Sequence, residues 1–315
     1  MKEVKLTEEI KKWGGYKKFL LRSGVPLEAN VSKICQKEGM MDLGEFFYKR
    51  EEDIFSVDLL ARDVHRKKAN DLEFGTFIDF LIECKYREPH KKWIFSSFEF
   101  GEKHLTGREM WLSNDFSISY PFDDIEVSNL IASIPRYIYE KINFDSCNKG
   151  VEVSDKGFDP NSINHALFQV LFAVPYQGIS EISAILEYGT SDDVVGEIIV
   201  PVIVTTSDLY LLDKSTDLEK IRESKNGEEI LKRKEIIQYE IQPPLHLTEY
   251  SNSLISKYEN NLPNQYLEDW SAMSIQSPSR VYIINYNYFP KYIKIIKILY
   301  GSIAKRSMEE YFKQR

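Results

Sequence analysis

The stretch Phe77-Ile78-Asp79-Phe80-Leu81-Ile82-Glu83-Cys84-Lys85-Tyr86-Arg87 has an apolar residue at every even position. Its charged residues, Glu83 and Lys85 among them, all fall on odd positions. Side chains alternate between the two faces of a β-strand, so this pattern predicts a half-buried strand over residues 76–87. Glu83 and Lys85 are therefore expected on one face, opposite the face that carries the apolar stripe.

A second alternating stretch, residues 55–62, precedes this strand. Its apolar residues occupy the odd positions, which directs Asp58 to the opposite side of a predicted strand. The intervening residues 63–74 are polar and predict an exposed connection. A hairpin of the two strands would bring Asp58 beside Glu83.

Two carboxylates that face each other repel, and a hard divalent cation bound through oxygen ligands relieves that repulsion. The cation expected for such ligands is Mg²⁺, with Mn²⁺ as a substitute. Lys85, one strand step beyond Glu83, would orient a metal-bound water or stabilise the charge that develops on a phosphate. This combination predicts hydrolysis of a phosphodiester bond without a covalent intermediate.

A helix is predicted ahead of these strands, over residues 26–38. Pro26 suits a first helical position and Gly39 suits a helix stop. Glu28 lies about 100° from Leu27, at the edge of the predicted buried stripe of Leu27, Val31, Ile34 and Cys35. The helix dipole favours a Glu in the first turn whatever its function, so the position of Glu28 alone indicates no role.

Asp58 followed by Glu83-Cys84-Lys85 resembles the active-site signature of the PD-(D/E)XK, or restriction-endonuclease-like, nuclease superfamily. Members commonly place a Glu-bearing helix ahead of the first strand. The resemblance covers residues 24–88 and implies an α/β fold with a restriction-endonuclease-like core, in which helices flank a central mixed β-sheet. Val57 replaces the Pro of the signature, and Pro201 would deprive the last core strand of one ladder N–H. The implied core strands are residues 44–50, 55–62, 76–87 and 198–205, with a second helix at 161–174.

The resemblance also implies roles for the site residues. Asp58, Glu83, Lys85 and Glu28 would be catalytic, and the metal ligands would be Asp58, Glu83 and the carbonyl of Cys84. The implied activity is that of a Mg²⁺-dependent endonuclease that acts on DNA in restriction or defence. Many members dimerise to cut both strands, so a homodimer is one expected state. The alternative is a noncatalytic nucleic-acid-binding or regulatory protein that retains the fold, which a purely acidic surface around Asp58 would favour.

Each of these residues also has a structural explanation. Asp58 could simply end a strand, and Glu83 with Lys85 could form an exposed ion pair that contributes only about 0.2–1 kcal/mol. Asp79 shares the face of Glu83, and we expect it to be a solvated group rather than a hydrogen-bonding neighbour of the site.

Other polar residues are candidates for phosphate contacts. His165 and Gln169 lie one turn apart on the predicted helix 161–174, where the alternative is a buried hydrogen-bonded pair. Arg87, Lys91 and Lys92 follow the proposed catalytic strand. They would flank a cleft, unless they are ordinary solvated charges.

Length and charge are compatible with this interpretation. The chain has 315 residues, enough for a large core, and its net charge of −8 argues against a protein that coats nucleic acid. Any contact with DNA must therefore be local. The three cysteines lack a Cys-x-x-Cys pair, which predicts reduced thiols. Because we find neither a secretory signal nor an apolar run of about 20 residues, we expect a cytoplasmic protein that does not span a membrane.

The chain is expected to divide into four regions. These are a helical prelude at 1–23, a nuclease core at 24–88 and 161–213, an insertion at 89–160 that forms a lid or substrate-reading surface, and a C-terminal α/β extension at 214–315 packed on the core. Within them we expect helices at 125–141, 216–234, 248–260 and 290–312, a loop at 148–159 and a strand at 281–287.

Overall fold

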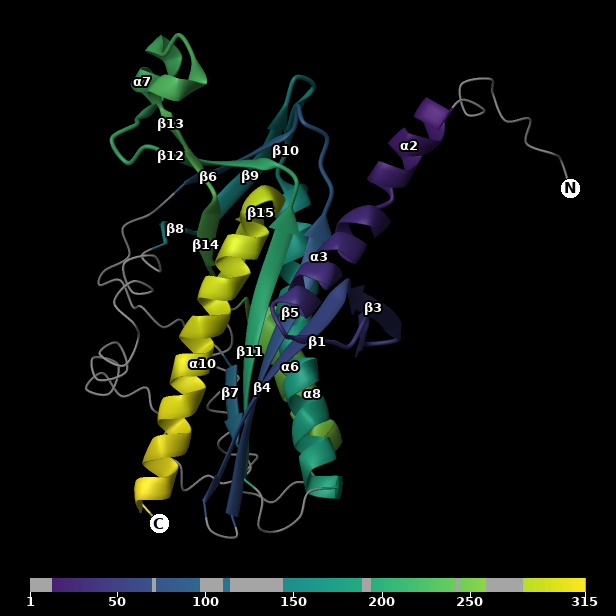
Figure 1. Cartoon of the computed structure of the whole chain (residues 1–315). Coiled ribbons are helices and arrows are strands. Elements are labelled where there is room, and N and C mark those ends of the chain that lie inside the picture. The colour runs from purple at the N-terminus through teal and green to yellow at the C-terminus, as the bar shows by residue number, and fades with distance from the viewer. Residues whose placement is uncertain are drawn as a thin grey trace, which may run out of the picture.

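The computed structural model describes residues 13–69, 72–96, 110–113, 144–188, 194–241, 244–258 and 280–314. Within these residues the chain is an α/β protein built on a mixed central sheet with helices on both faces (Figure 1). The strand order is β1-β4-β5-β11-β15-β14-β8, and β7 also pairs with β11. The strands are β1 (Met41–Asp42), β4 (Leu59–Ala69), β5 (Leu72–Lys85), β7 (Met110–Ser113), β8 (Ser146–Cys147), β11 (Val194–Thr205), β14 (Ile236–Glu240) and β15 (Arg280–Asn285).

The middle of this sheet consists of β4, β5 and β11. β4 and β5 form an antiparallel hairpin with Leu59 opposite Ile82, and β11 runs parallel to β5 with Val202 beside Ile82. Pro201 lies on β11 between the residues that pair with β7, which end at Ile199, and those that pair with β15, which begin at Val202. The residue that lacks an N–H therefore lies at the gap between two neighbouring strands, where a missing donor is tolerated.

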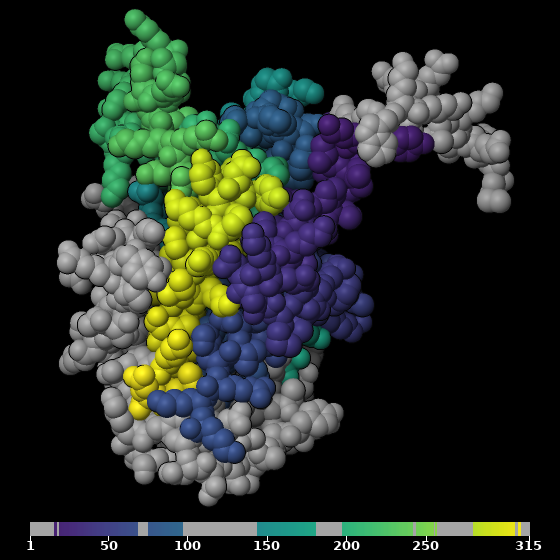
Figure 2. Space-filling model, viewed as in Figure 1, coloured from purple at the N-terminus to yellow at the C-terminus, as the bar shows by residue number. Residues whose placement is uncertain are grey.

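The two faces of the sheet carry different helices. α3 (Val25–Lys37) and α10 (Phe289–Gln314) pack on one face, whereas α6 (Asn161–Tyr188) and α8 (Leu245–Tyr258) pack on the other (Figure 1). Even-numbered residues of β5 such as Ile82 bury against α3 and α10, while Leu81 buries against α6. Figure 2 shows α10 beside α3 across one surface, where Lys297 Nζ donates to the carbonyl of Glu38. The predicted alternation of β5 is therefore confirmed.

Two smaller sheets complete the described fold. One has the strand order β10-β9-β6-β12-β13 and lies beyond one end of the central sheet (Figure 1). The other is the hairpin of β2 (Phe46–Arg50) and β3 (Asp53–Val57). The five-stranded sheet consists of β6 (Lys92–Ser96), β9 (Lys149–Ser154), β10 (Gly157–Asp159), β12 (Asp208–Leu212) and β13 (Leu231–Lys234). It therefore combines strands from the predicted insertion, core and extension.

The strand boundaries around Asp58 differ from the prediction. Residues 55–62 are not one strand, because the chain leaves β3 at Val57 and enters β4 at Leu59. The predicted strand 44–50 pairs only with β3 among the described strands, so it lies outside the central sheet. The predicted exposed connection at 63–74 is also wrong, since β4 continues to Ala69 and β5 begins at Leu72.

The helix predictions have mixed outcomes. α3, α8 and α10 form close to their expected positions, and α6 runs well past 174 to Tyr188. Residues 216–234 are not one helix but α7 (Leu218–Glu223), a short 3₁₀ turn η1 (Gly227–Glu229) and β13. The predicted loop 148–159 forms the β9–β10 hairpin. The predicted helix 125–141 lies outside the described residues, as does the prelude before α2 (Trp13–Arg22). No helix in the described ranges is long and apolar enough to cross a membrane.

Candidate active site

Asp58 lies at the junction where the chain passes from the β2–β3 hairpin into the central sheet. Its Oδ2 accepts a hydrogen bond of 2.6 Å from the backbone N–H of Cys84 on β5. The β4–β5 ladder begins with Leu59 opposite Ile82, so Asp58 and Glu83 each lie next to a residue of the first pair, and the charge of Asp58 acts on Glu83. Burial raises the pKa of Asp58, although the Cys84 hydrogen bond and the charge of Lys85 counteract it.

Glu83 is the most buried acid of the site, with only 1% of the residue exposed. Its Oε1 accepts a hydrogen bond from Lys85 Nζ, but its Oε2 has no hydrogen-bond partner within the described structure. Burial raises the pKa of Glu83 to about 8, since the opposing effect of Lys85 is smaller and the negative charge of Asp58 acts in the same direction as burial. The net effect of these surroundings is to disfavour the charged form of Glu83.

Lys85 connects the sheet to α6. Besides Glu83, its Nζ donates a hydrogen bond of 2.8 Å to Oε1 of Gln169. Gln169 is half-buried, and its Nε2 lies 3.5 Å from the carbonyl of Ser56, next to the β3–β4 junction. The predicted helix residue Gln169 thus reaches the site and helps to hold the ammonium group of Lys85, whose side chain is 19% exposed.

Glu28 approaches the same place from the first turn of α3. Its half-buried carboxyl has a pKa raised first by burial and then by the charges of Asp58 and Glu45. We did not predict Glu45. It follows a loop in which Leu43 N–H donates to the Leu60 carbonyl and Leu60 N–H donates to the Gly44 carbonyl. This loop pairing, which the local sequence does not reveal, anchors the segment that carries Glu45, whose charge acts on Asp58.

Asp58 and Glu83 fit a divalent cation as a pair. The unpaired, buried Oε2 of Glu83 is an oxygen ligand without a donor, and a cation would favour the charged forms of both acids. In the part of the chain that the structure describes, no three His, Cys, Asp or Glu side chains are grouped to bind one metal ion. The Cys84 thiol is buried on the opposite face of β5, where burial raises its pKa well above the usual value. Cys84 would therefore contribute only its carbonyl, with water completing the ligand set.

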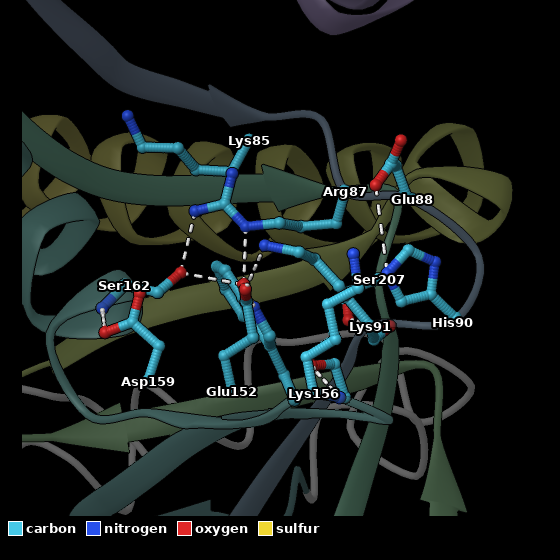
Figure 3. A network of polar contacts seen from close by, with 12 residues as sticks. Lys85, Arg87, Glu88, His90, Lys91, Glu152, Lys156, Asp159, Ser162 and Ser207 are labelled. Carbon is cyan, nitrogen blue, oxygen red and sulfur yellow. Dashed lines mark hydrogen bonds and ion pairs between the residues drawn. The ribbon is translucent and has the colours of Figure 1, made fainter.

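Arg87 and Lys91 contact a different carboxylate. Arg87 Nε donates to Oε2 of Glu152 at 2.6 Å, and Lys91 Nζ donates to Oε1 at 2.7 Å. Trp93 Nε1 and Ser162 Oγ donate to the same carboxylate. Figure 3 shows Arg87, Lys91 and Ser162 converging on Glu152, whereas Lys85 lies beside the network without a contact to it. Burial alone would raise the pKa of Glu152, but its hydrogen bonds and the charge of Arg87 lower the pKa to about 2.

The other two candidate phosphate contacts, Lys92 and His165, also lie in surroundings of their own. Lys92 forms an ion pair with Asp208, and His165 is exposed on α6 rather than part of a buried pair with Gln169. That Arg87, Lys91, Lys92 and His165 contact phosphate stays a prediction.

The prediction that Asp79 is a solvated group is wrong. It is fully buried rather than solvated, and its carboxylate accepts hydrogen bonds from Arg62 Nε at 2.6 Å and Arg62 Nη2 at 2.7 Å. Gln177 of α6 donates to the same carboxylate at 2.7 Å. A strand carboxylate with an arginine directly across the hairpin can be buried as a pair, which alternation alone does not indicate.

The central group of predicted residues is brought together from four elements. α3, the β3–β4 junction, β5 and α6 supply Glu28, Asp58, Glu83 with Lys85, and Gln169. Comparisons with models of known protein families, with curated proteins and with solved structures found no match to this chain. The functional assignment therefore depends on the geometry of these residues.

Proposed function

We propose that the chain is a metal-dependent endonuclease that hydrolyses phosphodiester bonds, with DNA as its substrate. The observation that carries this proposal is the meeting of Asp58, Glu83 and Lys85, with Asp58 hydrogen-bonded to the backbone between the other two. An acid pair beside an ammonium group has the composition needed to bind a cation and a phosphate together.

In this proposal Asp58 and Glu83 hold Mg²⁺ or Mn²⁺ through carboxylate oxygens, with the Cys84 carbonyl as a third protein ligand. The bound cation would supply Lewis-acid chemistry, since it lowers the pKa of a coordinated water and neutralises phosphate charge. The two acids are in an environment that disfavours their charged forms. Ligation would therefore relieve an unfavourable electrostatic state that the protein has without it.

Lys85 would act on the substrate. Its ammonium is held by Glu83 and Gln169, so it is oriented before any phosphate arrives. From that position it would donate a hydrogen bond to a nonbridging phosphate oxygen or to the attacking water, where charge develops in the transition state. Glu28 would serve as an auxiliary acid, because its raised pKa makes it easier to protonate than an ordinary Glu.

The arrangement of elements supports a restriction-endonuclease-like core. α3 precedes the β4–β5 hairpin, and α6 then leads to β11, which pairs in parallel with β5. This is the order implied by the resemblance, although β2 lies outside the central sheet. The finding that Cys35, Cys84 and Cys147 are buried free thiols supports the proposed cytoplasmic location. A homodimer that cuts both strands stays part of the proposal.

The alternative is a noncatalytic nucleic-acid-binding or regulatory protein. The surroundings of Asp58 include the Lys85 ammonium and are not purely acidic, which favours the enzyme. The test is incubation of supercoiled plasmid, linear duplex and single-stranded DNA, and of RNA, with Mg²⁺, Mn²⁺ or EDTA. The proposal expects cleavage of DNA with either cation and none with EDTA. Binding of DNA in a gel-shift assay, without cleavage in either cation, would support the alternative.

A further inference from the structure

Gly24 and Glu28 meet at the start of α3. Gly24 has a φ of +84°, and its carbonyl accepts hydrogen bonds from the N–H groups of Leu27 and Glu28. A Cβ atom added at Gly24 would lie 2.7 Å from Oε1 of Glu28 and 3.9 Å from its Cδ. The Glu28 side chain therefore folds back over Gly24 and occupies the space that a side chain at position 24 would need.

The backbone conformation of Gly24 does not by itself explain this contact. Gly39 and Gly44 also have a φ of +80°, yet a Cβ at Gly39 would meet only Lys297 Nζ at 3.7 Å and one at Gly44 would meet nothing within 4 Å. Positive φ favours glycine at all these positions. Among the positive-φ glycines that the structure describes, Gly24 alone combines that conformation with a carboxylate in the place of its missing side chain.

Packing ties this contact to the proposed active site. Leu27, the neighbour of Glu28, lies in the same buried cluster as Leu59, the neighbour of Asp58, and as Cys84, which lies between Glu83 and Lys85. The Glu28 carboxyl is close enough to Asp58 and Lys85 for their charges to act on it. A displacement of the Glu28 carboxylate would thus change the charge distribution around the proposed metal and phosphate.

We propose that Gly24 is a positioning residue, whose missing side chain leaves the space that holds the Glu28 carboxylate toward Asp58 and Lys85. This inference rests on the proposed nuclease function. The atom that a Cβ would strike is the end of a flexible side chain, not backbone. Gly24→Ala would therefore displace Glu28 while the fold is retained.

Gly39→Ala is the matched control. Gly24 and Gly39 flank the same helix, with nearly equal positive φ values of +84° and +80°. An alanine meets an unfavourable positive φ at both positions, but at Gly39 it makes only an ordinary contact with Lys297 Nζ. A slower cleavage by Gly24→Ala than by Gly39→Ala that disappears when Glu28 is removed would report the displacement of Glu28.

The experiment uses the full chain as wild type, Gly24→Ala, Gly39→Ala, Glu28→Ala and Gly24→Ala/Glu28→Ala. Three properties are measured: the thermal midpoint, the affinity for Mn²⁺ by calorimetry without nucleic acid, and the rate of DNA cleavage with Mn²⁺. We expect both glycine variants to lose thermal stability, because alanine is unfavourable at a positive φ. We expect Gly24→Ala to cleave at least about tenfold more slowly than Gly39→Ala and to bind Mn²⁺ more weakly, as for other residues that orient a metal site. In the Glu28→Ala background, Gly24→Ala should slow cleavage no more than Gly39→Ala slows the wild type.

Three outcomes with the variants would overturn the inference. One is equal cleavage and equal Mn²⁺ affinity for the two glycine variants, and another is a full Gly24→Ala effect in the Glu28→Ala background. The third concerns folding. If Gly24→Ala fails to fold, Gly24→Ala/Glu28→Ala is expected to fold, because the clashing carboxylate is gone. A double variant that also fails to fold would overturn the inference. If the wild type binds Mn²⁺ but cuts nothing, the proposed function fails and the Mn²⁺ affinities alone decide the inference. A wild type that neither cuts nor binds Mn²⁺ overturns both.

Discussion

The backbone N–H of Cys84 on β5 donates a 2.6 Å hydrogen bond to Oδ2 of Asp58, which lies at the junction of β3 and β4. Cys84 is flanked by Glu83 and Lys85, so this one bond sets the position of Asp58 relative to both. A backbone donor cannot change rotamer, and it therefore orients the carboxylate more rigidly than a side chain would. The proposed site is consequently organised by the central sheet itself.

Gln169→Leu should reduce cleavage about tenfold, because Lys85 loses the acceptor that orients it from α6. The fold should persist, since Gln169 is only half-buried. Initial cleavage rates and thermal midpoints would be compared with those of Asn164→Ala, a change at an exposed position on the same helix. Equal rates for the two variants would show that Gln169 does not orient Lys85.

Glu152→Gln should destabilise the protein by about 3 kcal/mol, because Arg87 and Lys91 lose a buried counter-charge. Urea denaturation measures this loss. Asp155→Asn is the control, as that side chain is 70% exposed and lies 3.9 Å from His90, where an ion pair contributes under about 1 kcal/mol. Similar urea midpoints for both variants would mean that the Glu152 network contributes little to stability.

The same carboxylate predicts a pH dependence. The pKa of Glu152 falls from an ordinary 4.5 to about 2 on folding. A depressed pKa stabilises the fold fully above 4.5, and this contribution is lost as the pH falls toward 2. The difference in the free energy of unfolding between wild type and Glu152→Gln should therefore shrink by up to about 3 kcal/mol as the pH falls from 5 to 2. Urea midpoints of both proteins across this range test it, and a constant difference would contradict the assignment.

Arg62→Met should cost about 3–5 kcal/mol, because it removes the guanidinium that neutralises the fully buried Asp79. Adding Asp79→Asn should recover part of that loss, since the remaining group is neutral. Lys49→Met, which breaks an exposed pair with Glu52, provides the comparison and should change stability little. Urea unfolding of the four proteins gives the values, and failure of Asp79→Asn to recover any stability would argue against a charge effect.

The alternation of residues 77–87 predicts β5 and the shared face of Glu83 and Lys85 because both depend on local periodicity. The break at Asp58 leaves no such signal. Val57 packs on the α6 face of the sheet and Leu59 on the α3 face, yet both are buried. Hydrophobicity alone cannot distinguish burial on one face from burial on the other, so the sequence reads as one continuous strand.

The other wrong predictions concern polar residues that were expected to be exposed. Asp63 and His65 were expected in an exposed connection, but they lie on β4, where Asp63 pairs with His65 at 2.9 Å and with Lys297 of α10 at 3.2 Å. Glu152 likewise becomes buried because Arg87, Lys91 and Trp93 reach it from distant segments. A polar run indicates exposure only when no partner compensates for burial, and such partners are invisible in local sequence.

The most direct test of the central claim is the Mg²⁺-dependent cleavage of DNA by wild type, Asp58→Asn, Lys85→Met and the exposed control Asp155→Asn. Asp58→Asn preserves shape but removes the charge proposed to bind the cation, and Lys85→Met removes the ammonium proposed to act on the phosphate. We predict cleavage by the wild type and the control, and a loss of at least about 100-fold in the other two with their folds intact. Wild-type cleavage that persists in both Asp58→Asn and Lys85→Met would contradict the proposed active site.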